Sequence, residues 1–256
     1  MPTQKIEAAA QFLFAARNRR TPGERIPQDV RPADVAEALA VAQRVTDLVG
    51  QPVGGYKCSV PSDARPVAFA AIFAPTIVTA SPCRIMPVNG KAKVEPEIAF
   101  VIGRDLPARK NPYSDDEIRA AVKEARLVIE ILGPRYADPT GIAYPELLAD
   151  SIANQALFVG PAISKPFERD LTRFQFAIQD AMGSLMDREG THPDGNPEWP
   201  LRWLANHLAG TSTPLRAGQI VTTGSYAGAV DVPLDLALTF VYGDLGTLTV
   251  TFTPAS

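Results

Sequence analysis

Two glutamates separated by a single residue, Glu95 and Glu97, are the first feature of the sequence that could carry chemistry. They lie in residues 94–102, VEPEIAFVI, a pattern typical of a β-strand. Residues two apart in a strand point to the same face, so the two carboxylates share one face and the apolar residues hold the other. Carboxylates this close repel each other unless one is protonated or a cation lies between them. Taken alone, however, the pair is better explained as the solvated face of an edge strand, because exposed glutamates are common and Pro96 lacks a backbone donor.

Glu130 adds a third carboxylate, inside the apolar run of residues 127–132, LVIEIL. Runs of this kind are normally buried on both faces of a sheet. A buried carboxylate without a partner is costly or takes up a proton, so Glu130 needs Arg135, a hydrogen-bond network or a metal ion. Three converging glutamates would suit Mg²⁺ or Mn²⁺, since hard cations take oxygen ligands and keep positions open for water and substrate.

Lys57 is a lone cation in a segment of small and apolar residues, 54–59, GGYKCS. The glycines there permit close approach of a ligand or of another backbone. The ordinary interpretation is a surface lysine at the end of a strand. The functional interpretation is an ammonium group that binds a substrate carboxylate or moves a proton.

The elements that must position these residues are two helices followed by a strand-rich body. Apolar residues recur at helical spacing over residues 4–19 and 33–49, and further helices are expected at 114–126, 144–156 and 199–208. The 18 glycines and 24 prolines favour many short strands and turns elsewhere. Strands are expected at 53–59, 68–78, 94–103, 158–163, 174–181, 184–187, 219–225, 236–242 and 246–253. The sequence therefore predicts the α+β class, with an N-terminal helical segment (1–50) and a body (51–256) in one compact unit.

The composition excludes several classes of partner. With 25 basic and 28 acidic residues the net charge is −3, and aromatic residues make up 7%, so we expect no nucleic-acid binding. The most apolar stretch, residues 67–80, is too short to span a bilayer and contains Pro75, so we expect no membrane partner. Two cysteines, Cys58 and Cys83, cannot form a disulfide framework, which indicates a reducing, cytoplasmic location.

In their order along the chain these motifs resemble those of the 2-keto-4-pentenoate hydratase / 2-oxo-3-hexenedioate decarboxylase family, a branch of the fumarylacetoacetate hydrolase superfamily. The resemblance covers nearly the whole chain, and its most specific part is the Glu-Pro-Glu-Ile-Ala-Phe stretch. The matching segments are 55–57 (GYK), 95–100 (EPEIAF), 129–131 (IEI) with Arg135, 150–155 (DSIANQ), 203–206 (WLAN) and 215–225 (LRAGQIVTTGS).

The resemblance implies a mixed β-roll body that encloses a site for Mg²⁺ or Mn²⁺. Glu95, Glu97 and Glu130 would hold the ion, and Lys57 would be the catalytic lysine. Candidate substrate-binding residues are Ser59, Arg135, Gln155, Thr223 and Ser225. A homo-oligomer is also implied.

The implied substrates are 2-oxo or 2-hydroxy-dienoic acids formed by meta-cleavage of aromatic compounds. A divalent ion chelated by the carboxylate and the 2-oxo oxygen would act as a Lewis acid and stabilise an enolate. The expected activity is that of a metal-dependent hydratase. The alternatives are a decarboxylase or C–C hydrolase of 2-oxo acids on the same scaffold, and a binding or partner subunit that has lost turnover.

The sequence departs from the family pattern in its proton-transfer residues. Residues 75–81, PTIVTAS, contain no acid where many members have an acidic pair. Gly133 replaces the usual aspartate between the third glutamate and the arginine, and Asn154-Gln155 stands where Asp-Asn is common. We therefore expect an intact metal site beside an altered proton-transfer apparatus.

Overall fold

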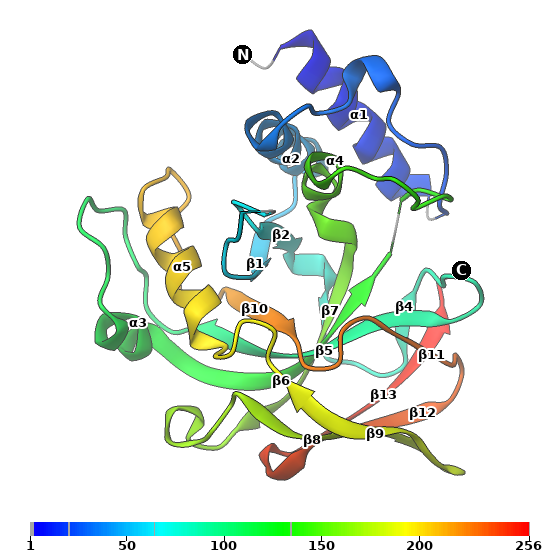
Figure 1. Cartoon of the computed structure of the whole chain (residues 1–256), viewed down its shortest axis with the longest axis vertical. Helices are drawn as coiled ribbons and strands as arrows, with labels where there is room; N and C mark the ends of the chain where they lie inside the picture. The colour runs from blue at the N-terminus through cyan, green and yellow to red at the C-terminus, as the bar shows by residue number, and fades with distance from the viewer. Residues whose placement is uncertain (1–2, 20, 64, 134, 256) are drawn as a thin grey trace.

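A curled, mixed sheet of eight strands forms the centre of the computed structural model, which describes residues 3–19, 21–63, 65–133 and 135–255 (Figure 1). In spatial order the strands are β2 (Phe69–Phe73), β1 (Val53–Cys58), β10 (Ile220–Ser225), β5 (Ala92–Ile102), β6 (Val122–Leu132), β7 (Asn154–Ile163) and β3 (Ile77–Val78), with β11 (Val230–Val232) also paired to β5. The β1–β10 and β3–β7 pairs are parallel, and the others are antiparallel.

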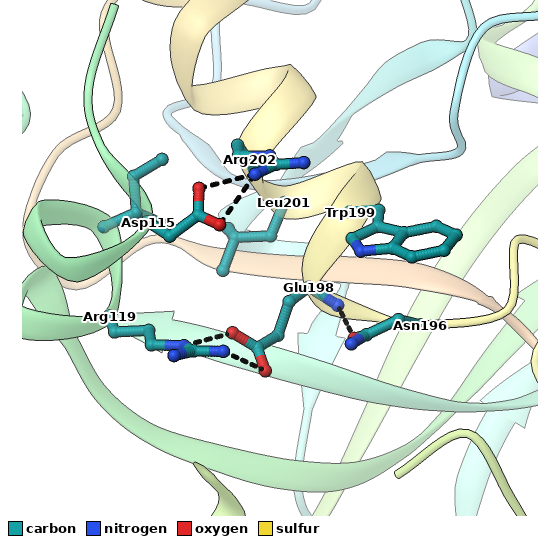
Figure 2. A pocket seen from close by; sticks show the side chains of 8 residues that line it. Asp115, Arg119, Asn196, Glu198, Trp199, Leu201 and Arg202 are labelled. Atoms are coloured by element: carbon teal, nitrogen blue, oxygen red, sulfur yellow. Dashed lines mark hydrogen bonds and ion pairs between the residues drawn. The ribbon is translucent and has the colours of Figure 1, made fainter.

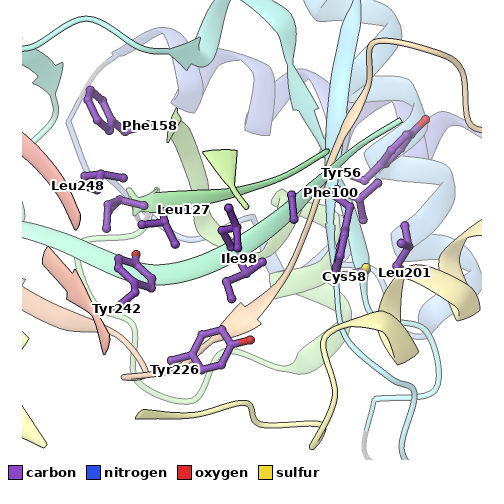
Figure 3. Packing of buried hydrophobic residues seen from close by; sticks show 14 of the residues in the cluster. Tyr56, Cys58, Ile98, Phe100, Leu127, Phe158, Leu201, Tyr226, Tyr242 and Leu248 are labelled. Atoms are coloured by element: carbon purple, nitrogen blue, oxygen red, sulfur yellow. The ribbon is translucent and has the colours of Figure 1, made fainter. Parts of the chain in front are cut away.

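The described residues also form a second sheet of five strands. Its order is β4 (Cys83–Ile85), β13 (Thr247–Pro254), β12 (Ala237–Tyr242), β8 (Arg173–Asp180) and β9 (Gly183–Thr191). Of these, β8, β9, β12 and β13 lie toward the bottom of Figure 1 and β4 lies at the right. The buried Tyr242 links the two sheets, because its hydroxyl donates to the Val128 carbonyl of β6 at 2.8 Å. Figure 3 shows Tyr242 in the main apolar core, with Leu127 and Ile98 of the first sheet and Leu248 of the second.

The helices form two groups outside the sheets. Helices α1 (Gln4–Arg19), α2 (Val35–Val49) and α4 (Tyr144–Ala149) lie together at the top of Figure 1, whereas α3 (Asp115–Ala121) and α5 (Glu198–Ala209) lie at the left. The first group has its own apolar cluster, which includes Leu13, Val41 and Leu148. No helix in the described part of the chain has the length and apolar character needed to cross a membrane.

The α+β prediction, with N-terminal helices followed by a mixed β-roll body, is confirmed. The helix predicted over residues 114–126 is wrong in its second half. Ser114 caps a helix that ends at Ala121, and residues 122–132 form one long strand paired with β5 along its length. Tertiary pairing decides this segment, because β5 offers a complete row of backbone partners and local helix preference is weak by comparison.

The helix predicted over residues 144–156 is also too long. It ends at Ala149, and Ser151, Ile152 and Ala153 all have positive φ angles, of 56°, 51° and 58°. Non-glycine residues take this backbone conformation only when the surroundings require it. The turn redirects the chain into β7, whose first residue, Asn154, lies at the candidate site.

Candidate metal centre

Strand register brings the three glutamates together. Glu95 of β5 lies directly opposite Glu130 of β6, and Glu97 lies two residues further along the same face of β5. One carboxylate oxygen from each residue lies within 4.8 Å of the other two. The structure thus gathers three acids that are 35 residues apart in sequence at most, on two neighbouring strands.

Glu130 is the most deeply buried of the three. Its side chain is 0% exposed, and its Oε1 accepts hydrogen bonds from Lys57 Nζ at 2.6 Å and from Asn154 Nδ2 at 2.9 Å. Its Oε2 has no hydrogen-bond partner in the described chain. Arg135, one of the alternative partners considered for Glu130, does not pair with it. Arg135 instead donates to backbone carbonyls, including that of Asn154, and lies 3.4 Å from Asp150.

Lys57 is the cation of this site. Its Nζ bonds to Glu130 and to the Ile152 carbonyl at 3.2 Å, and it lies 4.0 Å from Glu95. Burial alone lowers the pKa of Lys57, but attraction to Glu130 and Glu95 outweighs it, so the pKa lies above its ordinary value. Lys57 is therefore protonated at neutral pH in this arrangement.

The Glu97 carboxylate accepts hydrogen bonds from two donors and is repelled by the two neighbouring carboxylates. The Thr222 hydroxyl and the Gly224 N–H, the latter at 2.8 Å, both donate to its Oε2. Burial, followed by the negative charges of Glu130 and Glu95, raises the pKa of Glu97 to about 8. Burial is likewise the main cause that raises the pKa of Glu95. At neutral pH the metal-free site therefore holds a proton on Glu97, at a position where a divalent cation would offset the negative charge of all three carboxylates.

The donor set fits a hard divalent cation. Three carboxylates share one ammonium group, so the ionised site carries excess negative charge in a low-dielectric interior. The unpartnered Oε2 of Glu130 is a buried acceptor that a metal ion would satisfy. Oxygen-only ligands suit Mg²⁺ or Mn²⁺ and disfavour softer ions.

A cavity of about 270 Å³ opens beside the glutamates. Five residues predicted to form the site line it: Lys57, Ser59, Glu95, Glu97 and Ser225. The Ser225 hydroxyl donates to the Gly228 carbonyl at 2.9 Å. The cavity is large enough for a small organic acid next to the carboxylates.

The other three residues predicted to bind substrate do not line this cavity. Arg135 is buried as described above. Gln155 pairs with the backbone of Met86, whose N–H donates to its Oε1 at 2.8 Å. Thr223 is fully buried and donates to the Ile98 carbonyl at 3.2 Å. Their role in substrate binding stays a prediction.

The departures from the family pattern near β6 and β7 fit together. A side chain at position 133 would collide with the amide of Gln155, so Gly133 makes room for it. Asn154 donates to Glu130. An aspartate in its place would add a fourth negative charge beside the triad.

The sequence analysis assigned no role to four further residues that the structure places at the candidate site. Thr222 and Asn154 hold Glu97 and Glu130, while Arg65 and Asp194 line the cavity. The sequence did contain a signal for Thr222, because only one of the adjacent Thr222 and Thr223 can point to the same face of the sheet as Glu97. Arg65 and Asp194 lie in loops, where no periodic sequence pattern indicates which way a side chain points.

A second hollow, between α3 and α5, has a different character (Figure 2). Its volume is about 40 Å³. Asp115 pairs with Arg202 at 2.7 Å, and Arg119 pairs with Glu198 at 2.6 Å. These two ion pairs join α3 to α5.

Known proteins resemble the chain over most or nearly all of its length. No protein-family model matches the sequence. A 2-keto-4-pentenoate hydratase from Paraburkholderia phymatum is 31% identical, over 97% of each chain. In fold, the chain is similar to 4-oxalocrotonate decarboxylase from Pseudomonas putida G7, solved with magnesium and adipate, with a TM-score of 0.78 at 19% identity over 98% of each chain. It also resembles fumarylpyruvate hydrolase from Pseudomonas aeruginosa, solved with Mn²⁺ and pyruvate, with a TM-score of 0.54 at 15% identity over 78% of this chain and 89% of that one.

Proposed function

The chain belongs to the 2-keto-4-pentenoate hydratase family, and from this premise we propose that it is a metal-dependent hydratase of a 2-hydroxy-dienoic or 2-oxo-enoic acid. Glu95, Glu97 and Glu130 hold Mg²⁺ or Mn²⁺ in this proposal. The solved structural neighbours carry magnesium or manganese together with small organic acids, which supports the assignment.

The observation that carries the proposal is the unpartnered Oε2 of Glu130 within the cluster of three carboxylates. A structural ion-pair network would satisfy this atom and would balance the charge. Here one ammonium group faces three acids, and the cavity opens beside them. Perturbed carboxylates in a cavity are typical of a functional site.

The bound ion supplies Lewis acidity toward the carboxylate and 2-oxo oxygens of the substrate. Lys57 holds positive charge at the same wall and can neutralise charge that develops on the 2-oxo oxygen or transfer a proton. Thr222 and Gly224 keep Glu97 in place, and Asn154 does the same for Glu130. Preorganised charges of this kind stabilise a transition state without reorganisation during the reaction.

Decarboxylation of a 2-oxo acid is the second candidate. Its support is the fold similarity to 4-oxalocrotonate decarboxylase over 98% of the chain. Both reactions pass through an enolate of the 2-oxo acid, so the same carboxylates and lysine serve either. The family's further implications, a homo-oligomer in the cytoplasm, also remain proposals, and light scattering would test the first.

The decisive assay incubates purified protein and Mg²⁺ or Mn²⁺ with 2-hydroxypenta-2,4-dienoate and follows the loss of diene absorbance. A parallel sample receives 2-oxohex-3-enedioate and is monitored for released CO₂. Metal-dependent loss of the diene, abolished by a chelator, supports the hydratase. Release of CO₂ without hydration supports the second candidate, and no turnover of either acid contradicts both.

A further inference from the structure

We infer that Asp194 is the general base that activates water in the cavity, a role for which residues 75–81 offer no acid. The inference rests on the proposed hydratase function. Asp194 lies in the segment between β9 and α5, and among the described cavity residues it is the single acid outside the Glu95/Glu97/Glu130 cluster.

The segment where the family has its acidic pair provides no substitute. Ile77 and Val78 form β3, which pairs with β7, and residues 79–81 are exposed. Ser81 accepts a hydrogen bond from Thr251 N–H of the second sheet. None of these residues lines the cavity.

The remaining titratable groups of the cavity wall are unsuited to the task. The Cys58 thiol is buried against the Thr222 carbonyl, and burial raises its pKa well above the ordinary value. The Tyr144 hydroxyl donates to the Val67 carbonyl. Arg65 is a cation that cannot give up its proton. Lys57 is already protonated beside Glu130, so it cannot accept a proton from water. Elimination within the cavity therefore leaves one carboxylate.

Asp194 is held in a way that suits a catalytic carboxylate. Its Oδ2 accepts from Val60 N–H at 2.8 Å, and its own N–H donates to His192 Nδ1 at 3.2 Å. These two contacts fix the residue to the end of β1 and to the end of β9. Its Oδ1 has no hydrogen bond or ion pair to any described residue. The side chain is therefore anchored by one oxygen and has the other available.

The chemistry needs one base for water. The dienol loses its 2-hydroxyl proton and gains a proton at C5, which gives the conjugated 2-oxo-3-enoate. Water then bonds to C4, the carbon β to the carbonyl. The C3=C4 π electrons form a C2=C3 bond, and the carbonyl π electrons move onto the 2-oxo oxygen. Asp194 accepts the proton that the water loses. The enolate takes up a proton at C3, and Asp194 releases its proton to solvent, so protons and electrons balance.

The test compares Asp194→Asn with wild type in three measurements. Asparagine keeps an oxygen for Val60 N–H but cannot accept a proton from water. We expect hydration of 2-hydroxypenta-2,4-dienoate to fall by roughly 10²–10⁴-fold in kcat. Mn²⁺ affinity by calorimetry should be unchanged. Deuterium exchange at C3 of 2-oxopentanoate should stay within about twofold, because that acid has no double bond for water to attack.

Asp170→Asn is the matched control, since Asp170 also accepts a backbone N–H, from Thr172, but does not line the cavity. It should leave all three measurements unchanged. Hydration by Asp194→Asn within about twofold of wild type would overturn the inference. Loss of Mn²⁺ binding and of exchange together with hydration would also overturn it, because Asp194 would then be structural. If wild type itself consumes no dienoate, the proposed function fails first and the inference fails with it.

Discussion

The charged side chains between α3 and α5 and those at the centre of the first sheet each lie beside a hollow, and the two clusters differ in their balance of charge. Between α3 and α5, Asp115 and Arg119 each have an opposite charge at hydrogen-bond distance, and all four side chains are at least partly exposed. At the centre of the first sheet, three glutamates share Lys57, and Glu130 is fully buried. The first cluster is solvated and neutral, whereas the second is buried and carries excess negative charge.

This difference separates a structural role from a functional one. Exposed ion pairs contribute at most about 1 kcal/mol each, and nothing about them requires a ligand. Buried carboxylates that repel each other reduce the stability of the metal-free fold, so a bound cation is the simplest reason for them to be there. The comparison predicts that substitutions in the glutamate cluster change metal binding or turnover, whereas a substitution between α3 and α5 changes only the stability of the fold, and by little.

The largest effect is expected for Glu97→Gln, which removes one proposed metal ligand. Metal affinity should fall by more than the roughly 10–100-fold that loss of an outer-shell partner costs, and turnover should fall with it. The metal-free fold should remain, since the change removes one of the mutually repelling acids. Calorimetry with Mn²⁺ and circular dichroism measure the two outcomes. Unchanged Mn²⁺ affinity would remove Glu97 from the metal site.

Lys57→Met should have the next largest effect. Loss of the ammonium group should reduce turnover on a 2-oxo acid by roughly 10²–10⁴-fold, while Mn²⁺ still binds. The metal-free variant should also unfold more readily at neutral pH, because Glu130 loses its ion-pair partner. Steady-state kinetics and denaturant titration provide the readouts. Activity within about twofold of wild type would exclude Lys57 from the catalytic set.

Metal-free stability should depend on pH through Glu97. Its folded pKa of about 8 lies above the ordinary value of 4.5. Between these values the folded state binds a proton that the unfolded state has lost, so stability falls as pH rises across the window. Glu97→Gln should lack this slope. Denaturant titration of both proteins from pH 5 to 8 measures the difference, and parallel curves would contradict the assignment.

Metal binding should reverse this trend. An ion that replaces the proton on Glu97 binds more tightly as pH rises toward 8, and it stabilises the native state by mass action. At a hundredfold excess over the dissociation constant the gain is about 2.7 kcal/mol. Thermal unfolding with and without Mn²⁺ at pH 6 and pH 8 tests this, and a melting temperature insensitive to metal would count against the site.

The smallest effect is expected in the hollow of Figure 2, where Arg202→Ala breaks the pair with Asp115. The cost in unfolding free energy should be at most about 1 kcal/mol. Metal affinity and turnover should match wild type. A loss of metal binding here would mean that the two clusters are coupled.

The sequence predicts the three glutamates and the lysine because their signals are local. Alternation puts Glu95 and Glu97 on one face, and the apolar run around Glu130 indicates burial. Their mutual geometry depends on strand order and register, which single-sequence patterns do not contain. The pairing of Lys57 with Glu130, in place of Arg135, depends on how the curled sheet brings β1 near β6.

The same limit explains the choice between two neighbouring threonines. Thr222 lies opposite Ala99, on the face that Glu97 also occupies, so its hydroxyl reaches Glu97, whereas Thr223 points to the other side. The sequence predicts a helix up to position 126, inside β6, because a capped helix does begin at Ser114. No local sequence pattern shows where the helix ends and pairing with β5 begins.

The most direct test of the metal centre is a crystal structure of the protein soaked with Mn²⁺ and examined for anomalous scattering. We expect one peak at roughly 2.0–2.6 Å from an oxygen of each of Glu95, Glu97 and Glu130, with the Oε2 of Glu130 among the ligands. A peak elsewhere, or no peak while Lys57 remains bonded to Glu130, would contradict the account.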